Sequence, residues 1–204
     1  EDRLGPPIVN ADRFADRFSL KAGPRDAILR LLEGCFMQSC LPENTAVLVK
    51  DSAGEVRRVT LDHFDAMLND EPDCSALGNL KVLGRDGWVE LTSVSRRRLW
   101  EGEELLCVRT RSGQISLTGD HKIAVKRGME DVVVPARDLG AGDAIMAFEQ
   151  PALGKSARPV GEDPVFRPFG VLSVIRTVGY DGSVYQVETS DHTLVANDFL
   201  TQTV

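Results

Sequence analysis

Two kinds of side chain in this sequence could do covalent or acid–base chemistry near neutral pH. Cys40 is a potential nucleophile, because a thiolate is the most available strong nucleophile among the side chains. The three histidines, His63, His121 and His192, could move protons, since the pKa of an imidazole lies near the working pH. Taken singly, a free cysteine is usually a buried small apolar residue and a lone histidine a hydrogen-bonded surface residue, so their order along the chain matters more.

That order is regular. Cys40 begins a β-rich region, and Thr118 and His121 form a Thr-x-x-His sequence at the end of a later predicted strand. His192 lies between two predicted strands near the end of the chain. His63 falls in a predicted turn or helix start, away from such a pattern.

The elements that must position these residues change at Cys40. Residues 1–39 have balanced charges and an apolar stripe at helical spacing from Ile28 to Phe36, which predicts one short amphipathic helix. From Cys40 onward, short β-rich runs alternate with turn residues, which predicts an all-β sandwich, barrel or related fold. The runs are 45–50, 56–60, 82–91, 104–110, 114–117, 123–126, 131–134, 143–148, 171–178, 183–188 and 192–196. Residues 65–78 and the proline-containing 149–168 are predicted loops.

Composition excludes several classes of function. The 204 residues carry a net charge of −7, which disfavours non-specific nucleic-acid binding. No apolar run reaches the roughly 20 residues that a membrane helix needs, so we expect no membrane partner. The four cysteines lack both a disulfide framework and paired metal-ligand spacing, so we expect free thiols, a reducing intracellular compartment, no metal and no cofactor. We expect a monomer, and the start at Glu1 indicates a piece of a longer protein.

Four segments, in order, make the chain resemble the Hint superfamily of inteins, intein-like domains and Hedgehog autoprocessing domains. They are SCLPENTAVLVKDSAGEVRRV from Ser39, LTGDHKIAV from Leu117, ARDLGAGDAIMA from Ala136 and VYQVETSDHTLVAN from Val184. The resemblance implies an all-β, horseshoe-like fold with pseudo-two-fold repeats. It divides the chain into an upstream flank, 1–39, with its short helix, and a minimal autoprocessing domain, 40–204, without a homing endonuclease.

The resemblance also implies a mechanism. Cys40 would attack the carbonyl of Ser39 in an N-to-S acyl shift, and the thioester would pass to a small thiol or water. Thr118 would orient the scissile bond, His121 would protonate its nitrogen, and His192 would assist steps at the C-terminal end. The substrate would be the chain's own flanking polypeptide, so the reaction would be a single turnover rather than enzymatic turnover.

Two departures from the family pattern predict that splicing is impaired or absent. Gln186 stands where the family usually has Asp or Cys. The terminal His-Asn pair is replaced by Gln202-Thr203 in the ungapped match, and threonine has no side-chain amide to cyclise. In the alternative register, Gln202 is the terminal residue and Thr203 the following nucleophile, which would allow a splicing-competent mini-intein. Asn197 matches an internal position of the last block.

Three further expectations remain open on sequence alone. The basic stretch Arg96-Arg97-Arg98 is expected to be a solvated strand end or loop, and Hedgehog-like sterol transfer is not expected. Cys74 and Cys107 are expected to occupy core or surface positions without a chemical role. Cys35 could form a disulfide with Cys40. The rival functions are a processing-dead binding or linker module and a cysteine hydrolase acting in trans; the intact mass with and without a thiol separates them.

Overall fold

A computed structural model describes residues 39–65, 77, 79–99, 102–149, 164–177 and 179–203. The predicted helix in the 1–39 flank, the proposed Cys35 disulfide and Cys74 lie outside these residues. In the described part the fold is all-β, as the sequence predicted, with two short 3-10 turns, η1 (Leu61–Phe64) and η3 (Ala136–Asp138). The strands are β1 (Leu41–Pro42), β2 (Ala46–Lys50), β3 (Val56–Thr60), β4 (Lys81–Leu83), β5 (Trp88–Arg98), β6 (Leu105–Arg109), β7 (Gln114–Thr118), β8 (Lys122–Arg127), β9 (Glu130–Pro135), β10 (Ala144–Phe148), β11 (Phe166–Gly170), β12 (Ser173–Thr177), β13 (Ser183–Thr189), β14 (Thr193–Ala196) and β15 (Phe199–Gln202).

Two expected boundaries were wrong. The predicted hairpin strand ending at residue 91 continues as β5 to Arg98 and pairs along its length with β13. The predicted loop 149–168 ends earlier than expected, because Phe166 already begins β11. Pro168 lies inside β11, where a missing N–H is tolerated because, among the described strands, β11 pairs only with β10.

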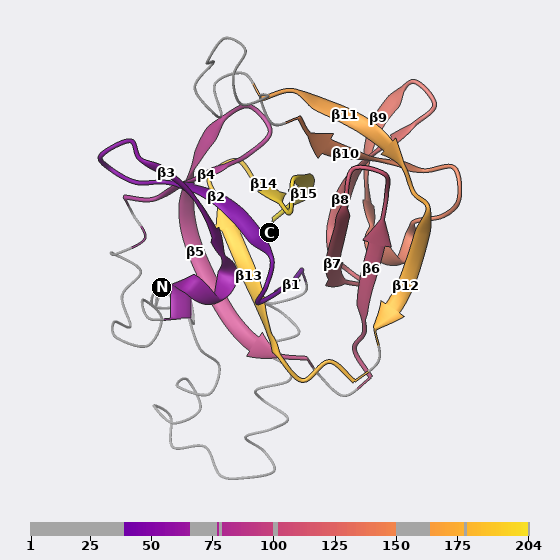
Figure 1. Cartoon of the computed structure of the whole chain (residues 1–204), viewed down its shortest axis with the longest axis horizontal. Helices are drawn as coiled ribbons and strands as arrows, with labels where there is room; N and C mark the ends of the chain where they lie inside the picture. Colours follow the sequence, from indigo (N-terminus) through magenta and orange to yellow (C-terminus); the bar gives the residue numbers. More distant parts are fainter. Residues whose placement is uncertain are drawn as a thin grey trace, which may run out of the picture.

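The strands are arranged as one long curved sheet and one small sheet (Figure 1). Within the described residues, the long sheet has the order β1-β13-β5-β4-β2-β14-β15-β10-β8-β9, with β3 beside β2 and β11 beside β10. The small sheet has the order β12-β6-β7. In Figure 1, β2, β4, β5 and β13 lie on one side, β6 to β12 lie on the other, and β14 and β15 lie between them.

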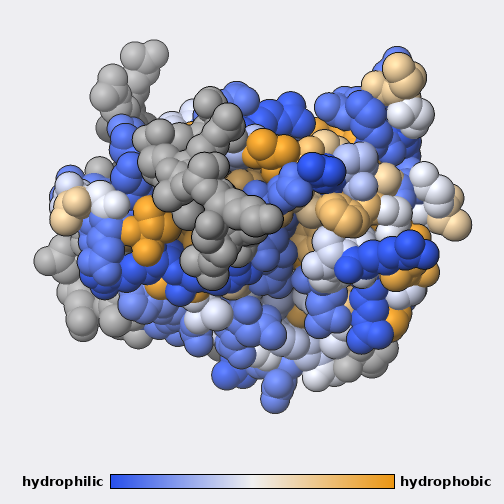
Figure 2. Space-filling model, turned by 45° about the horizontal axis from the view of Figure 1, so that its top comes forward, coloured by the Kyte–Doolittle hydropathy of each residue, from blue (hydrophilic) through white to orange (hydrophobic). Residues whose placement is uncertain are grey.

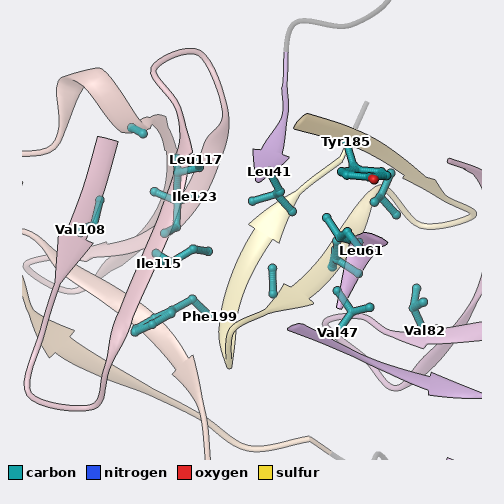
Figure 3. Close-up of a cluster of buried hydrophobic side chains, with 14 of the residues drawn as sticks. Leu41, Val47, Leu61, Val82, Val108, Ile115, Leu117, Ile123, Tyr185 and Phe199 are labelled. Atoms are coloured by element: carbon teal, nitrogen blue, oxygen red, sulfur yellow. The ribbon is translucent and has the colours of Figure 1, made fainter. Parts of the chain in front are cut away.

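One hydrophobic core spans both sides (Figure 3). Val47, Leu61, Val82 and Tyr185 form one group of buried side chains, and Val108, Ile115, Leu117 and Ile123 form another. Leu41 lies between the two groups in Figure 3, and Phe199 lies next to Ile115; both side chains are almost fully buried. Burial of each such side chain contributes about 1.5–3 kcal/mol. Because Leu41 comes from β1 and Phe199 from β15, packing of the core fixes both ends of the described domain near its centre.

The view in Figure 2 shows a largely hydrophilic surface with apolar residues in small, separate patches. The large apolar side chains that are exposed include Met129, in the β8–β9 turn, and Leu172, between β11 and β12. Within the part of the chain that the structure describes, no helix has the length and apolar character needed to span a bilayer.

Candidate active site

A tight turn explains why Thr118 and His121 are spaced by three residues. The N–H of His121 donates to the carbonyl of Thr118 at 3.0 Å, which closes a four-residue turn between β7 and β8. Two more backbone bonds anchor the turn to η3: Ala136 N–H to the His121 carbonyl at 2.9 Å, and Arg137 N–H to the Gly119 carbonyl at 3.0 Å. The turn therefore presents both side chains from a rigid strand end.

Thr118 makes three contacts with the backbone of Cys40. Its N–H donates to the Cys40 carbonyl at 3.0 Å, and its Oγ1 accepts from the Cys40 N–H at 3.0 Å. The same Oγ1 lies 3.3 Å from the Cys40 carbonyl oxygen. Thr118 is almost completely buried, so these bonds form away from water, where electrostatic interactions are stronger. The Ser39–Cys40 peptide is thus clamped on the nitrogen that an N-to-S shift would release.

His121 lies against the same peptide. Burial lowers the pKa of its imidazole to about 4, and backbone groups of Ser39 and Cys40 act in the opposite direction. Neither ring nitrogen makes a well-aligned hydrogen bond within the described residues. The ring is therefore neutral near pH 7, buried, and next to the bond that the sequence motif indicated. A neutral imidazole with an uncommitted nitrogen can first accept a proton and then deliver it.

Cys40 itself is fully buried, in a small apolar cluster with Leu105 and Val184. Desolvation raises the pKa of its thiol to about 12. The guanidinium of Arg97 contacts the thiol and lowers this pKa, whereas the carboxylate of Glu103 raises it. The apolar surroundings thus disfavour the thiolate form of Cys40, whereas the buried guanidinium of Arg97 favours it.

The expectation that residues 96–98 form a solvated strand end was wrong for two of the three arginines. The Arg97 side chain is almost completely buried and holds the Glu103 carboxylate with both Nη atoms, at 2.6 Å for Nη2. Arg96 pairs with Asp65 at 2.8 Å. Only Arg98 is exposed. No local pattern identifies Arg97 as a site residue, because its position depends on the pairing of β5 with β13 and of β13 with β1.

The C-terminal residues also lie near His121. Gln202 pairs with Lys122 of β8 and with Thr193 of β14, so one further step in both registers places Thr203 between His121 and His192. The N–H of Thr203 donates to the His192 carbonyl at 2.9 Å. The Thr203 hydroxyl lies 3.1 Å from the hydroxyl of Thr189. The chain thus brings both the Cys40 backbone and the Gln202-Thr203 segment next to His121.

His192 differs from His121 in its surroundings. It is exposed and has a positive φ of 60°, so it lies in a tight turn and does not begin β14 as expected. It is joined to the C-terminal segment through its backbone carbonyl.

Gln186, the residue at the position where the family usually carries Asp or Cys, is also buried. Its Nε2 donates to Glu188 at 3.1 Å, whereas its Oε1 has no hydrogen-bond partner in the described residues. Gln186 pairs with Ser95, two residues from the Val184–Arg97 pair, and therefore lies on the same sheet face as that pair.

Asn197 lies in a turn, where its side chain makes a structural contact. Asn197 and Asp198 both have positive φ, 47° and 67°, and form the two-residue turn of the β14–β15 hairpin. The Asn197 side chain accepts from Ala46 N–H at 2.8 Å, and Asp198 forms an ion pair with Arg58. These contacts connect the hairpin to β2 and β3, which explains an internal asparagine without assigning it a cyclisation.

The remaining candidates lie apart from Cys40. His63 is exposed on η1, and Cys107 is a half-buried free thiol on β6. Among the described residues, no group of three or more His, Cys, Asp or Glu side chains is arranged to hold a metal ion.

A cavity of about 410 Å³ adjoins the site. Glu103, which holds Arg97, lines it on one side, and Gly119 and Asp120 of the Thr118–His121 turn line it on the other. Arg137 and Arg176 complete its charged wall.

Comparison with known proteins gives a fold. No family model matches the chain. Among curated proteins, it is 27% identical over 121 residues to a replication factor C small subunit of Methanocaldococcus jannaschii; the match covers 55% of this chain and only 6% of that protein. An intein from a hyperthermophile superimposes with a TM-score of 0.63 at 18% identity, covering 80% of this chain and 99% of the intein.

Two other solved structures agree. The Pab PolII intein matches with a TM-score of 0.62 at 16% identity, covering 81% of this chain and all of that one. The KlbA intein precursor from Methanococcus jannaschii matches with a TM-score of 0.59 at 16% identity, covering 81% and 91% of the two chains. The chain therefore has the Hint fold of inteins, as its sequence blocks predicted.

Proposed function

We propose that this chain processes its own backbone once, by an N-to-S acyl shift at the Ser39–Cys40 bond. In this step the Cys40 sulfur bonds to the Ser39 carbonyl carbon, the carbon–nitrogen bond breaks, and a thioester replaces the amide. The proton lost by the thiol is regained by the new Cys40 amine, so the shift is neutral in protons overall. Neutral His121 is the group that can carry this proton from sulfur to nitrogen.

One observation carries the proposal: the Thr118–His121 turn contacts the backbone of Cys40 from a distant part of the sequence. Thr118 fixes the Cys40 N–H and carbonyl, and the His121 ring lies beside the Ser39–Cys40 backbone. Positioning of this kind lowers a barrier because the reacting groups do not have to be brought together. The intein fold supports the same reaction class.

The thioester would then be taken by a small thiol or by water. The cavity lined by Glu103 and Asp120 is a candidate place for this acceptor, because it adjoins the Thr118–His121 turn. A trans-acting hydrolase would need an accessible thiol, whereas the Cys40 side chain is fully buried. The substrate is accordingly the chain's own flank, residues 1–39, and the processing domain is 40–204.

We propose that C-terminal cleavage is impaired or absent. Excision in the intein manner needs a side-chain amide that attacks its own backbone carbonyl, and Thr203 has none. The alternative, with Gln202 cyclising and Thr203 as the acceptor, places a threonine, Thr201, where the assisting histidine would stand. The hydroxyl of Thr201 donates to the Leu194 carbonyl at 3.0 Å, so it already has a structural partner.

The test is the intact mass of the purified chain before and after incubation with dithiothreitol. We expect the thiol to release residues 1–39 and leave a fragment that begins at Cys40. The Cys40→Ala variant should remain whole, and Cys107→Ala, which removes a half-buried thiol on β6, should cleave like the parent.

Equal fragments from the parent and from Cys40→Ala would rule out the acyl shift. A parent chain that stays whole under all thiol concentrations would instead favour a Hint-fold module that binds or links without processing.

A further inference from the structure

Arg97 occupies a position that the proposed reaction would use. Arg97 pairs with Val184 in the β5–β13 ladder, and Val184 pairs with Pro42 in the β13–β1 ladder. Residues opposite one another share a sheet face, and residues two apart along a strand share it too, so Arg97 and Cys40 face the same side. Val184 and Cys40 pack together there.

Two groups fix the guanidinium. Glu103 accepts from both Nη atoms, and the carbonyl of Arg98 accepts from Nη1 at 3.0 Å. A forked, planar guanidinium held by a carboxylate on one side is fixed in orientation as well as in charge. The fold has therefore buried a cation in an apolar cluster against a thiol, which is costly unless that cation is used or paired.

We propose that Arg97 is a catalytic residue of the acyl shift: its guanidinium stabilises the negative charge on the Cys40 sulfur, and Glu103 holds it in place and limits its strength. The inference rests on the proposed function, because it concerns the same thiol. Arg97 exchanges no proton and supplies only charge. It acts twice, when sulfur attacks the Ser39 carbonyl and again when sulfur leaves as an external thiol takes the acyl group.

The charged and titratable groups that face the thiol differ in whether they favour or oppose its thiolate form. Arg97 favours the thiolate and Glu103 opposes it, while His121 is a neutral imidazole near pH 7. Tyr180 also packs on the Cys40 cluster, and its hydroxyl donates to the Ser183 carbonyl at 3.0 Å. Arg97 is therefore the one cation among these groups in the described structure.

The decisive experiment compares Arg97→Gln with Glu103→Gln. Both substitutions break the same ion pair, so a purely structural role predicts that both variants change in the same direction. The charge role predicts opposite directions: Arg97→Gln should slow thiol-induced cleavage at pH 7.5 at least tenfold, whereas Glu103→Gln should cleave faster than the parent. Arg97→Lys keeps the cation and should recover part of the lost rate.

Alkylation gives a second readout that does not depend on cleavage. The rate of iodoacetamide modification of Cys40 depends on the thiolate fraction and on local opening of its buried site, so it is measured relative to Cys107 in the same chain by peptide mass and compared between each variant and the parent. Arg97→Gln should lower this ratio at least tenfold and Glu103→Gln should raise it. The exposed neighbour provides the matched control, and Arg98→Gln should leave both readouts unchanged.

A double variant deals with the risk of misfolding, because Arg97→Gln leaves a carboxylate without its cation. Arg97→Met with Glu103→Leu replaces the pair by apolar side chains, which buried pairs often tolerate. If it melts like the parent and still loses at least tenfold in both readouts, the charge role stands. Parent-like cleavage and alkylation in this variant, or equal slowing by both single glutamine substitutions, would overturn it. Failure of the parent to cleave, with the alkylation ratios still moving oppositely, would instead reject the proposed function and keep the effect of Arg97 on the thiol.

Discussion

Two unlike groups of residues lie next to His121. In the first group, Cys40 is enclosed by buried partners that come from three strands or strand ends: Thr118 from β7, Arg97 from β5 and the His121 ring itself. In the second group, the Gln202-Thr203 segment is joined to His192, whose side chain is exposed. The first group has fixed dipoles and charges around a reactive atom, and the second has backbone and hydroxyl hydrogen bonds that complete a sheet.

If C-terminal cleavage is impaired, as proposed, the difference shows that a shared fold does not ensure that both halves of a reaction remain possible. The hydrogen bonds of β15 to β8 and β14 preserve the position of the C-terminal segment without requiring any particular side chain at 202 or 203. Backbone pairing is indifferent to side-chain chemistry, so the geometry of the second group can persist after its chemistry is lost. The contacts at Cys40, in contrast, involve the side chains of Thr118 and Arg97 themselves.

The largest expected effect is at His121. Removal of a positioned acid–base group typically lowers a rate 10²–10⁴-fold, about 3–5 kcal/mol of barrier. We expect His121→Ala to slow thiol-induced release of residues 1–39 by that factor, measured by intact mass over time. His63→Ala removes an exposed imidazole on η1 and serves as the control. If the two variants cleave at equal rates, the Thr118–His121 turn has no part in the first step.

The next effect concerns the Gln202-Thr203 segment, where restoring the missing side chains should restore C-terminal cleavage. Gln202→His with Thr203→Asn supplies an amide that can cyclise and an imidazole beside it, in a segment already placed by β-pairing. With Cys at 204 and a downstream tag, we expect partial tag release, detected by mass spectrometry. Buried Gln186 remains unchanged and is expected to limit the yield. Efficient ligation of both flanks by the parent sequence would instead support the Gln202–Thr203 register.

Local sequence signals predicted some elements of the molecule and failed for others. Local signals sufficed for the Thr118–His121 turn, for β3 and β10, and for the order of the elements, because strand propensity and turn residues act over a few positions. The same local rules failed at β11, where Pro168 suggested a loop. An edge strand that pairs on one side accommodates proline, and edge position is a property of the whole sheet.

Arg97 could not be predicted for the same reason. Three consecutive arginines are locally a solvated run, and their environments diverge only when β5 pairs with β13. That pairing puts Arg97 against Cys40 and leaves Arg98 in solvent, although the two are neighbours. Glu103 likewise becomes a partner only through tertiary contact. The pairing of distant strands therefore determines the positions of Arg97 and Glu103, which the spacing of residues along the sequence could not predict.

A smaller effect is expected at Thr118, which in the proposed step positions the bond without taking part in proton transfer. Thr118→Val keeps the shape but removes the acceptor for the Cys40 N–H, and a buried unsatisfied donor costs about 1–3 kcal/mol. We expect slower cleavage, by roughly tenfold, and a lower melting temperature. Thr118→Ser keeps the hydroxyl and should recover most of both losses. A Thr118→Val variant with parent rate and stability would show that the 3.0 Å bond is unimportant.

The last effect is on stability rather than on rate, and it separates a buried histidine from an exposed one. Burial holds the pKa of His121 at about 4 in the folded chain, below the ordinary value of 6.5. Between these two pH values the unfolded chain binds a proton that the folded chain does not, so unfolding becomes more favourable as the pH falls. The stabilising contribution is fully present above pH 6.5, and about 3 kcal/mol of it is lost on acidification to pH 4.

Urea unfolding should be followed between pH 4 and 7 in a Cys40→Ala background, which prevents cleavage during the measurement. His121→Gln should flatten this part of the acid dependence, whereas the same substitution at exposed His63 should preserve it. If both variants keep the acid slope of the parent background, the His121 ring is not held neutral by burial, and its assignment as the proton carrier on the Cys40 side loses its physical basis.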